Sequence, residues 1–205
     1  MKMRYIRLVM MAALSLLTMQ SFAQSSLSVL RKMLSSSTVS IECDYTTRIS
    51  NADITGRSQL LVQGNMYTMK GNGLAVYCNG TTLWTVDESS REVVIESCGS
   101  QEKDYMSNPV LLLSDLDRLF KVSSSRSLGS GKEEYILDAV VSCGVLQADL
   151  ILSSDGRILS GKFLLEDDTT LSVKVSSMKK TEEKQVSFFS PQHKFGSDWI
   201  VTDLR

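Results

Sequence analysis

The chain has little of what catalytic and metal-binding sites usually need. It contains a single histidine, His193, in a polar segment near the C-terminus. A Ser–His–Asp site holds its histidine between a nucleophile and a carboxylate, whereas we expect this histidine to be solvated on a surface loop. The sequence also lacks a Cys-x-x-Cys pair, a His-Glu-x-x-His motif and a phosphate-binding glycine loop. We therefore expect a protein that is not an enzyme and has no cofactor or metal.

Two short motifs with a superficial likeness to binding sites are better explained as turns. Gly71-Asn72-Gly73 is an isolated glycine pair and predicts a turn rather than a phosphate cradle. Glu166, Asp167 and Asp168 are adjacent carboxylates, which are typical of a solvated hairpin tip.

Clusters of basic residues are missing too. The chain has 22 Lys and Arg against 23 Asp and Glu, for a net charge of −1. Lys179-Lys180 is followed at once by Glu182-Glu183, so this patch is mixed in sign. Binding to nucleic acid needs clustered positive charge, and we expect no nucleic-acid partner.

The one long apolar run stands at the N-terminus. Three basic residues precede the run Leu8–Leu17, and Ser21-Phe22-Ala23 supplies small residues before a cut. This pattern predicts a secretory signal peptide cleaved after Ala23, with an uncleaved anchor as the alternative. Removing 23 of the 205 residues, with their three positive charges, leaves 182 residues and changes the net charge from −1 to −4. We expect residues 24–205 to be soluble outside the inner membrane and to form a single domain, because that length suits one domain.

Four cysteines, at positions 43, 78, 98 and 143, match no metal-binding spacing. A two-residue hairpin at Asn79-Gly80, with a second turn near Ser89, would put Cys98 beside Asn79, about 10 Å from Cys78 and on the other face of the sheet. A disulfide needs Cα atoms within about 7 Å, so this register argues against a Cys78–Cys98 bond. Buried thiols and a Cys43–Cys143 bond are both left open.

Residue patterns predict a chain made mainly of β-strands after a short N-terminal helix. The helix is expected over Ser25–Ser36, where leucines repeat on one face behind a serine cap. Alternation and turn residues then predict about ten or eleven antiparallel strands, enough for a barrel or a strongly curved sheet. Twelve segments carry these strand signals, at residues 39–45, 55–62, 66–70, 74–78, 81–86, 91–97, 121–124, 133–141, 146–152, 157–166, 169–177 and 184–189, and the serine-rich stretch 123–130 is expected to be a loop.

A very apolar helical segment interrupts the strands. Asn108 and Pro109 suit the start of a helix, and the segment from Val110 to Phe120 carries about seven large apolar side chains. Each such side chain contributes roughly 1.5–3 kcal/mol when it is fully buried. The segment either plugs the core of the sheet or covers an apolar cavity as a lid, and the residues alone leave both interpretations open.

A series of short motifs runs along nearly the whole chain, from Ser25 to about Pro191. In order they are Ser-Thr-x-x-Ile, Gly56-Arg57-x-x-Leu60-x-Val62, Asn65-Met66-Tyr67, Asn79-Gly80-Thr81-Thr82-Leu83-Trp84, Asn108-Pro109-Val110-Leu111-Leu112, Asp155-Gly156-Arg157-Ile158 and Phe188-Phe189-Ser190-Pro191. With these motifs the chain resembles the periplasmic outer-membrane lipoprotein carrier family, LolA-like. The most specific piece is the Asn-Gly-x-x-Leu-Trp turn at its distance before Asn-Pro-x-x-Leu-Leu.

The resemblance implies an unclosed antiparallel β-barrel with an α-helical lid and no catalytic activity. It implies a monomer that takes acylated lipoproteins from an inner-membrane transporter, shields their acyl chains and passes them to an outer-membrane acceptor. A sensor that binds lipids or lipoproteins on the same fold is the alternative function, and an enzyme whose residues leave no recognisable motif is a third.

Positions matching the family imply a ligand-binding cavity and lid made of apolar residues from the central strands and from the helical segment. They are Met66, Tyr67, Leu83, Trp84, Val110, Leu111, Leu112, Leu113, Leu116, Leu119 and Phe120. The family also has a basic residue followed by proline, just before the Asn-x-aromatic strand, that tethers the lid. This chain has Gln63 and Gly64 there.

Overall fold

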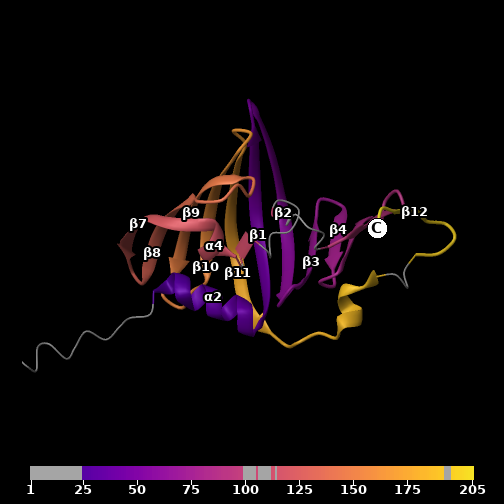
Figure 1. Ribbon diagram of the computed structural model, residues 1–205, viewed down its shortest axis with the longest axis horizontal. Coiled ribbons are helices and arrows are strands. Elements are labelled where there is room, and N and C mark those ends of the chain that lie inside the picture. The colour runs from indigo at the N-terminus through magenta and orange to yellow at the C-terminus, as the bar shows by residue number, and fades with distance from the viewer. Residues whose placement is uncertain (1–24, 99–104, 106–111, 114, 192–194) are drawn as a thin grey trace, which may run out of the picture.

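The computed structural model describes residues 25–98, 105, 112–113, 115–191 and 195–205. In this part of the chain, twelve strands form one sheet whose two end strands, β12 and β7, do not meet (Figure 1). The strand order is β12-β6-β5-β4-β3-β2-β1-β11-β10-β9-β8-β7. Neighbouring strands are antiparallel except β12, which runs parallel to β6. The unclosed, mainly β architecture expected from the sequence is confirmed.

Two consecutive meanders make up the sheet. The first contains β1 (Thr38–Ile49), β2 (Ala52–Gln63), β3 (Met66–Gly71), β4 (Leu74–Cys78), β5 (Thr82–Asp87) and β6 (Glu92–Ser97). The second contains β7 (Phe120–Gly129), β8 (Lys132–Ala139), β9 (Val145–Ser153), β10 (Ile158–Leu165) and β11 (Thr170–Thr181). Pairing of β1 with β11 joins the two meanders, and the β1–β2 hairpin projects beyond its neighbours (Figure 1).

The helix α2 (Ser26–Ser36) lies across one face of the sheet, where it contacts β1, β2 and β9 (Figure 1). Ser25 caps its first turn, because the Ser25 side chain accepts a hydrogen bond from the backbone N–H of Ser28. The spacing of Leu27, Leu30 and Leu34 puts these side chains on one stripe of the helix, and all three are buried. We call the face of the sheet that α2 covers the inner face.

A carboxylate on β8 fixes the start of α2. Glu133 accepts hydrogen bonds from the backbone N–H and the hydroxyl of Ser26, at 3.2 and 2.5 Å, and from the hydroxyl of Tyr135 at 2.7 Å. These donors, the Ser26 hydroxyl first, hold the pKa of Glu133 below its usual value. Because the pKa of Glu133 is lowered in the folded protein, the ionised carboxylate stabilises the fold. This stabilisation is complete above the ordinary pKa of a glutamate and is lost as the pH falls through the lowered pKa.

Two expectations about secondary structure are wrong, and one strand was not expected. The serine-rich stretch 123–130 is not a loop, because β7 continues to Gly129 at the edge of the sheet. Residues 184–189 do not form a strand, and Val186–Phe189 is instead a single 3-10 turn, η1. The strand β12 (Ile200–Asp203), beside β6, was not anticipated.

The helical segment is described only in part. Asn108, Pro109, Val110 and Leu111 lie outside the described residues, as do the expected signal peptide and His193. Leu112 and Leu113 are helical, and α4 (Leu116–Leu119) is a single turn. Phe120 is not part of that turn, since it opens β7. The turns expected at Gly71-Asn72-Gly73 and Asp167-Asp168 are confirmed, with positive φ at Asn72 and Asp168.

The Asn79-Gly80 turn differs from the expected two-residue hairpin, and the difference overturns the argument about the cysteines. Cys78 pairs with Leu83, so the turn has four residues rather than two. The Asn79 carboxamide closes it by accepting from the backbone N–H groups of Thr81 and Thr82, at 3.0 and 2.9 Å. This register puts Cys98 on the same face as Cys78, and their sulfur atoms are 3.1 Å apart.

No helix among the described residues is long and apolar enough to cross a membrane.

Candidate functional site

An apolar surface runs across the inner face of β2 to β5. Leu60 pairs with Met69, and Met69 pairs with Val76, so these side chains form one row across three strands. Val62, Tyr67, Cys78 and Leu83 form a second row beside the first. We call the apolar members of the two rows the apolar wall: Leu60, Val62, Tyr67, Met69, Val76 and Leu83. Strands lie about 4.8 Å apart, so the wall is about 14 Å wide.

The wall is only partly covered. Val62 and Tyr67 are buried, whereas Leu60, Met69, Val76 and Leu83 are each half-buried. Glu96, which pairs with Leu83, places one carboxylate at the edge of the wall. A row of half-exposed apolar side chains bordered by a polar edge is the kind of surface that binds an apolar ligand.

The other half of the inner face is filled by helices. Leu27, Leu30 and Leu34 of α2 pack in one core cluster with strands β8, β9 and β11. Leu116, Leu119 and Phe120 are buried in the same cluster, and Leu112 and Leu113 pack against it. The described part of the helical segment therefore packs on the inner face of the sheet.

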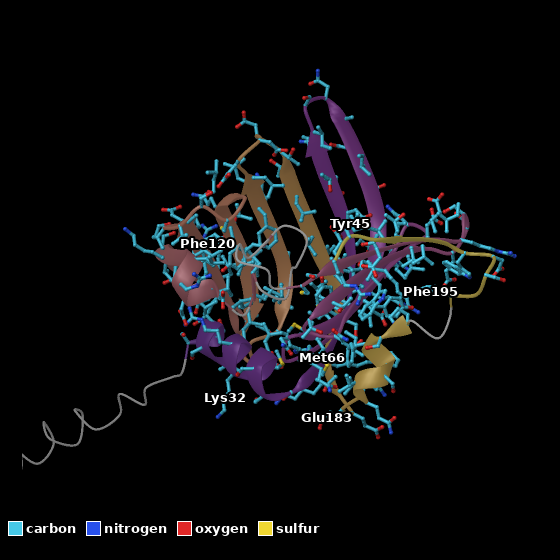
Figure 2. All side chains as sticks on the ribbon, turned by 45° about the vertical axis from the view of Figure 1, so that its right-hand side comes forward. Lys32, Tyr45, Met66, Phe120, Glu183 and Phe195 are labelled. Carbon is cyan, nitrogen blue, oxygen red and sulfur yellow. The ribbon has the colours of Figure 1, made fainter. Side chains whose placement is uncertain are left out.

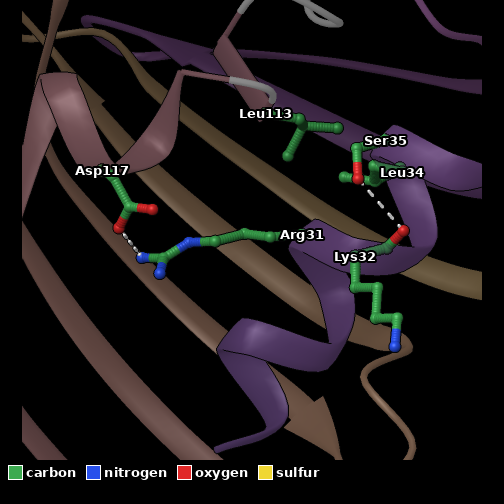
Figure 3. A pocket seen from close by; sticks show the side chains of 6 residues that line it. All are labelled: Arg31, Lys32, Leu34, Ser35, Leu113 and Asp117. Atoms are coloured by element: carbon green, nitrogen blue, oxygen red, sulfur yellow. Dashed lines mark hydrogen bonds and ion pairs between the residues drawn. The ribbon is translucent and has the colours of Figure 1, made fainter.

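A pocket separates α2 from the helical segment at the rim of this cluster (Figure 3). Arg31 points from α2 toward Asp117 of α4, with which it forms an ion pair, and Leu113 also lines the pocket. The pocket has a volume of about 200 Å³, below the ~300–1,000 Å³ of typical ligand pockets. A ligand of typical size would therefore need more space than this pocket offers.

Leu60 joins the filled half of the inner face to the apolar wall. Its half-buried side chain packs against the core cluster of α2 and also against the cluster of Val62, Tyr67 and Cys78. Because one residue contacts both clusters, the wall and the surface beneath the helices are continuous. A ligand on the wall would therefore border the α2 cluster at Leu60.

The site residues expected from the sequence do not come together in one place. Tyr67 and Leu83 belong to the wall, while Leu112, Leu113, Leu116, Leu119 and Phe120 belong to the α2 cluster. Met66 is half-buried and, as the neighbour of Tyr67 along the strand, faces the other way. Trp84 likewise faces away from Leu83, on the outer face of the sheet. Val110 and Leu111 lie outside the described residues.

A C-terminal segment covers the outer face around Trp84. Trp84 packs with Tyr77, Val86 and Ile95, and Phe195 and Trp199 pack over this cluster. The aromatic rings of Phe195 and Trp199 lie 5.0 Å apart, and Arg91 forms a 2.7 Å ion pair with Asp198. Figure 2 shows Phe195 at the opposite end of the molecule from Phe120. Sequence reasoning missed this cover, although the two aromatic residues after Pro191 were a signal for it.

Gln63 has a structural partner far along the chain. Its side-chain oxygen accepts hydrogen bonds from the Thr38 hydroxyl at 2.9 Å and from the backbone N–H of Lys184 at 2.7 Å. Its amide nitrogen donates to the Lys184 carbonyl at 2.9 Å. Gln63 thus connects β2, β1 and the segment after β11, at the position where the resemblance implied a basic lid tether.

We expect Gln63→Ala to lower the free energy of unfolding by about 1–2 kcal/mol, because the buried Thr38 hydroxyl and the backbone N–H and carbonyl of Lys184 lose these hydrogen bonds. Urea denaturation followed by circular dichroism measures the change. Gln59→Ala is the matched control, since Gln59 is exposed on the same strand and its loss should change stability by less than about 0.5 kcal/mol. Equal effects of the two substitutions would contradict the role assigned to Gln63.

Within the described residues, no group of three or more His, Cys, Asp and Glu side chains is arranged to hold a metal ion. The wall and the α2 cluster are lined by aliphatic and aromatic side chains. What this arrangement offers chemically is apolar contact area on a curved sheet.

Comparisons with known proteins match the fold rather than the sequence. No protein-family model and no curated protein sequence matches the chain. An uncharacterised conserved protein from Thermus thermophilus is similar in structure, with a TM-score of 0.52 and 19% identity over 89% of this chain and 99% of that one. At that identity the similarity shows a shared fold.

Two further solved structures align over most of their lengths. One is a LolA superfamily protein from Nitrosomonas europaea, with a TM-score of 0.46 and 14% identity over 83% of this chain and 98% of that one. The other is a putative outer membrane lipoprotein-sorting protein domain from Vibrio parahaemolyticus, with a TM-score of 0.44 and 11% identity over 83% of this chain and 98% of that one. The chain itself forms a single unclosed sheet, antiparallel except for β12, with an N-terminal helix on its inner face.

Proposed function

We propose that the protein is an exported carrier that binds the acyl chains of lipoproteins on the apolar wall and carries them from the inner to the outer membrane. The observation that supports this function best is the row of half-buried Leu60, Met69 and Val76 on the inner face. Core residues of a sheet are normally covered completely, whereas these side chains keep part of their surface accessible. On this proposal a lipoprotein-releasing transporter supplies the cargo and an outer-membrane acceptor receives it.

The energetics suit a carrier. Each methylene group moved from water to an apolar surface contributes about 0.8 kcal/mol, so a long acyl chain supplies ample free energy without a charged contact. Cys78 and Leu83 extend the wall toward Glu96 at its edge, where the polar end of a lipidated peptide can remain in water.

Release of so apolar a ligand needs a competitor for the same surface. Leu112 and Leu113 pack on the α2 cluster, and Leu60 connects that cluster with the wall. A bound chain that extends past Leu60 under the helices of this cluster must displace what packs there, and this cost lowers the net affinity. Because the net affinity is lowered in this way, the carrier can release the lipoprotein to its acceptor.

A substitution on the wall tests the proposal. We expect Met69→Glu to weaken the binding of a diacylated, fluorescently labelled lipopeptide at least tenfold, because a carboxylate on the wall loses its hydration when the acyl chains cover it. Fluorescence anisotropy measures the dissociation constant, and the same peptide without acyl chains should not bind. Lys70→Glu is the matched control: Lys70 is the next residue on β3, exposed on the outer face, and its change should leave the affinity within about twofold. Equal affinities of the folded Met69→Glu and Lys70→Glu proteins would refute acyl binding on the wall.

A further inference from the structure

Two cysteines meet at the edge of the apolar wall. Cys78 is the last residue of β4, and Cys98 directly follows β6. Their sulfur atoms lie 3.1 Å apart, and both cysteines are present as thiols. A disulfide has an S–S bond of about 2.05 Å, so the two sulfur atoms need to approach by only about 1 Å.

The backbone on both sides of this pair is held in place by hydrogen bonds. The backbone N–H of Cys98 donates to the carbonyl of Thr81 at 2.7 Å, and that of Asn79 donates to the carbonyl of Thr82 at 3.2 Å. Cys78 also belongs to the buried cluster of Val62 and Tyr67. Both sulfur atoms are thus positioned by the sheet itself, and neither depends on a long flexible side chain.

We propose that Cys78 and Cys98 form a disulfide that joins the ends of β4 and β6 beside the apolar wall. The oxidant is a disulfide, such as that of an exported thiol–disulfide oxidoreductase. One cysteine thiolate attacks a sulfur of the oxidant, which forms a mixed disulfide and expels the first oxidant thiol. The second cysteine then attacks the protein sulfur of the mixed disulfide and expels the second oxidant thiol. The two electrons and the two protons of the cysteines leave with the oxidant, and no other reactant is needed.

The structure also assigns the order of the two attacks. Cys98 is half-buried, whereas the side chain of Cys78 is fully buried, so an oxidant reaches Cys98 first. The hydrogen bond with Cys98, together with burial, raises the pKa of the Cys78 thiol, which further disfavours Cys78 as the first nucleophile. Once Cys98 carries the mixed disulfide, Cys78 is the neighbouring thiol that resolves it.

The other two cysteines have different surroundings. Cys143 is buried between β8 and β9, and its thiol donates to the carbonyl of Val145 at 3.5 Å. Cys43 is half-buried on β1, in the pair of strands that joins the two meanders. Burial raises the pKa of the Cys43 thiol, so it is a poor nucleophile at neutral pH.

Oxidation of the purified protein tests the proposal. The reduced protein is incubated with oxidised glutathione, alkylated in denaturant and digested for mass spectrometry. We expect a loss of two hydrogen atoms in mass, two alkylated cysteines rather than four, and one linked peptide pair that contains Cys78 and Cys98. Four alkylated cysteines after oxidation, or a link that joins Cys43 to Cys143, would overturn the proposal.

Two single variants test the order of attack without depending on the link itself. In Cys78→Ser the mixed disulfide cannot resolve, so a glutathione adduct should accumulate on Cys98. In Cys98→Ser the thiol of Cys78 stays buried and should remain unmodified in the folded protein. A glutathione adduct on Cys78 of folded Cys98→Ser, at the rate seen for Cys98 in the other variant, would refute the assigned order.

Discussion

Gly156→Ala is expected to lower the free energy of unfolding by at least about 3 kcal/mol, because Gly156 is where the sheet meets the backbone of α2. Its φ of +78° costs a residue with a side chain about 1–2 kcal/mol. An added Cβ would also lie 2.6 Å from the backbone nitrogen of Leu30 and 2.9 Å from the carbonyl carbon of Val29. Backbone atoms cannot rotate away as a side chain can, so α2 must move off the sheet.

Movement of α2 is costly because Leu30, directly at the contact, is 0% exposed. Loss of the packing of one buried leucine costs about 2–5 kcal/mol. Urea denaturation followed by circular dichroism measures the total, and lipopeptide binding to the variant shows whether the seating of α2 also matters for the wall.

Gly73→Ala separates the conformational cost of a side chain at positive φ from the cost of moving α2. Gly73 has a similar φ, +82°, and an added Cβ there would meet no atom within 4 Å. We expect only the conformational cost of about 1–2 kcal/mol. If the two glycine variants prove equally stable, α2 is not seated as closely against the turn after β9 as the structure shows.

Much of the fold was predictable because alternation is a local property of the chain. In β1, Val39 and Ile41 face the core and alternate with polar residues, as the period of a half-buried strand requires. The part of the serine-rich β7 after Ser124 and the short β12 escaped prediction because both strands are edge strands. An edge strand pairs on one side only and needs no apolar face, so its sequence carries little signal.

The candidate site was less predictable than the fold. The resemblance implied that Leu83 and Trp84 serve one cavity, but neighbouring residues on a strand face opposite ways. In the structure, Leu83 lies on the apolar wall, whereas Trp84 lies in a cluster on the outer face that Phe195 and Trp199 cover. A sequence shows that both faces of β5 are apolar, but it does not show which face a distant C-terminal segment covers.

The cysteine pair shows how one turn decides a long-range contact. Asn-Gly is a strong signal for a two-residue hairpin, and that turn would have separated Cys78 from Cys98. The Asn79 side chain instead closes a longer turn through its bonds to Thr81 and Thr82. The shift in register changes the face on which Cys98 lies, because strand side chains alternate with a period of two.

The helical segment provides the second large effect: Leu112→Glu is expected to weaken lipopeptide binding at least tenfold while the sheet stays folded. Leu112 packs against the α2 cluster from its surface and is half-buried, so a carboxylate there can reach water when no ligand is bound. In a complex with the segment closed over an acyl chain, the same carboxylate would be buried without a partner, which costs several kcal/mol. The substitution therefore acts mainly on the bound state.

Three measurements on Leu112→Glu decide between a lid and a plug. Circular dichroism should show an intact sheet. Urea denaturation should show that the free energy of unfolding falls by less than about 2 kcal/mol, because the leucine is only half-buried. Fluorescence anisotropy should show the loss of affinity for the lipopeptide. Val122→Glu is the matched control, since Val122 is an exposed apolar residue on the edge strand β7 and its change should leave binding intact. If Leu112→Glu stays folded and binds the lipopeptide as well as the unmodified protein does, the segment is a fixed plug, and the acyl chains bind on the wall without it.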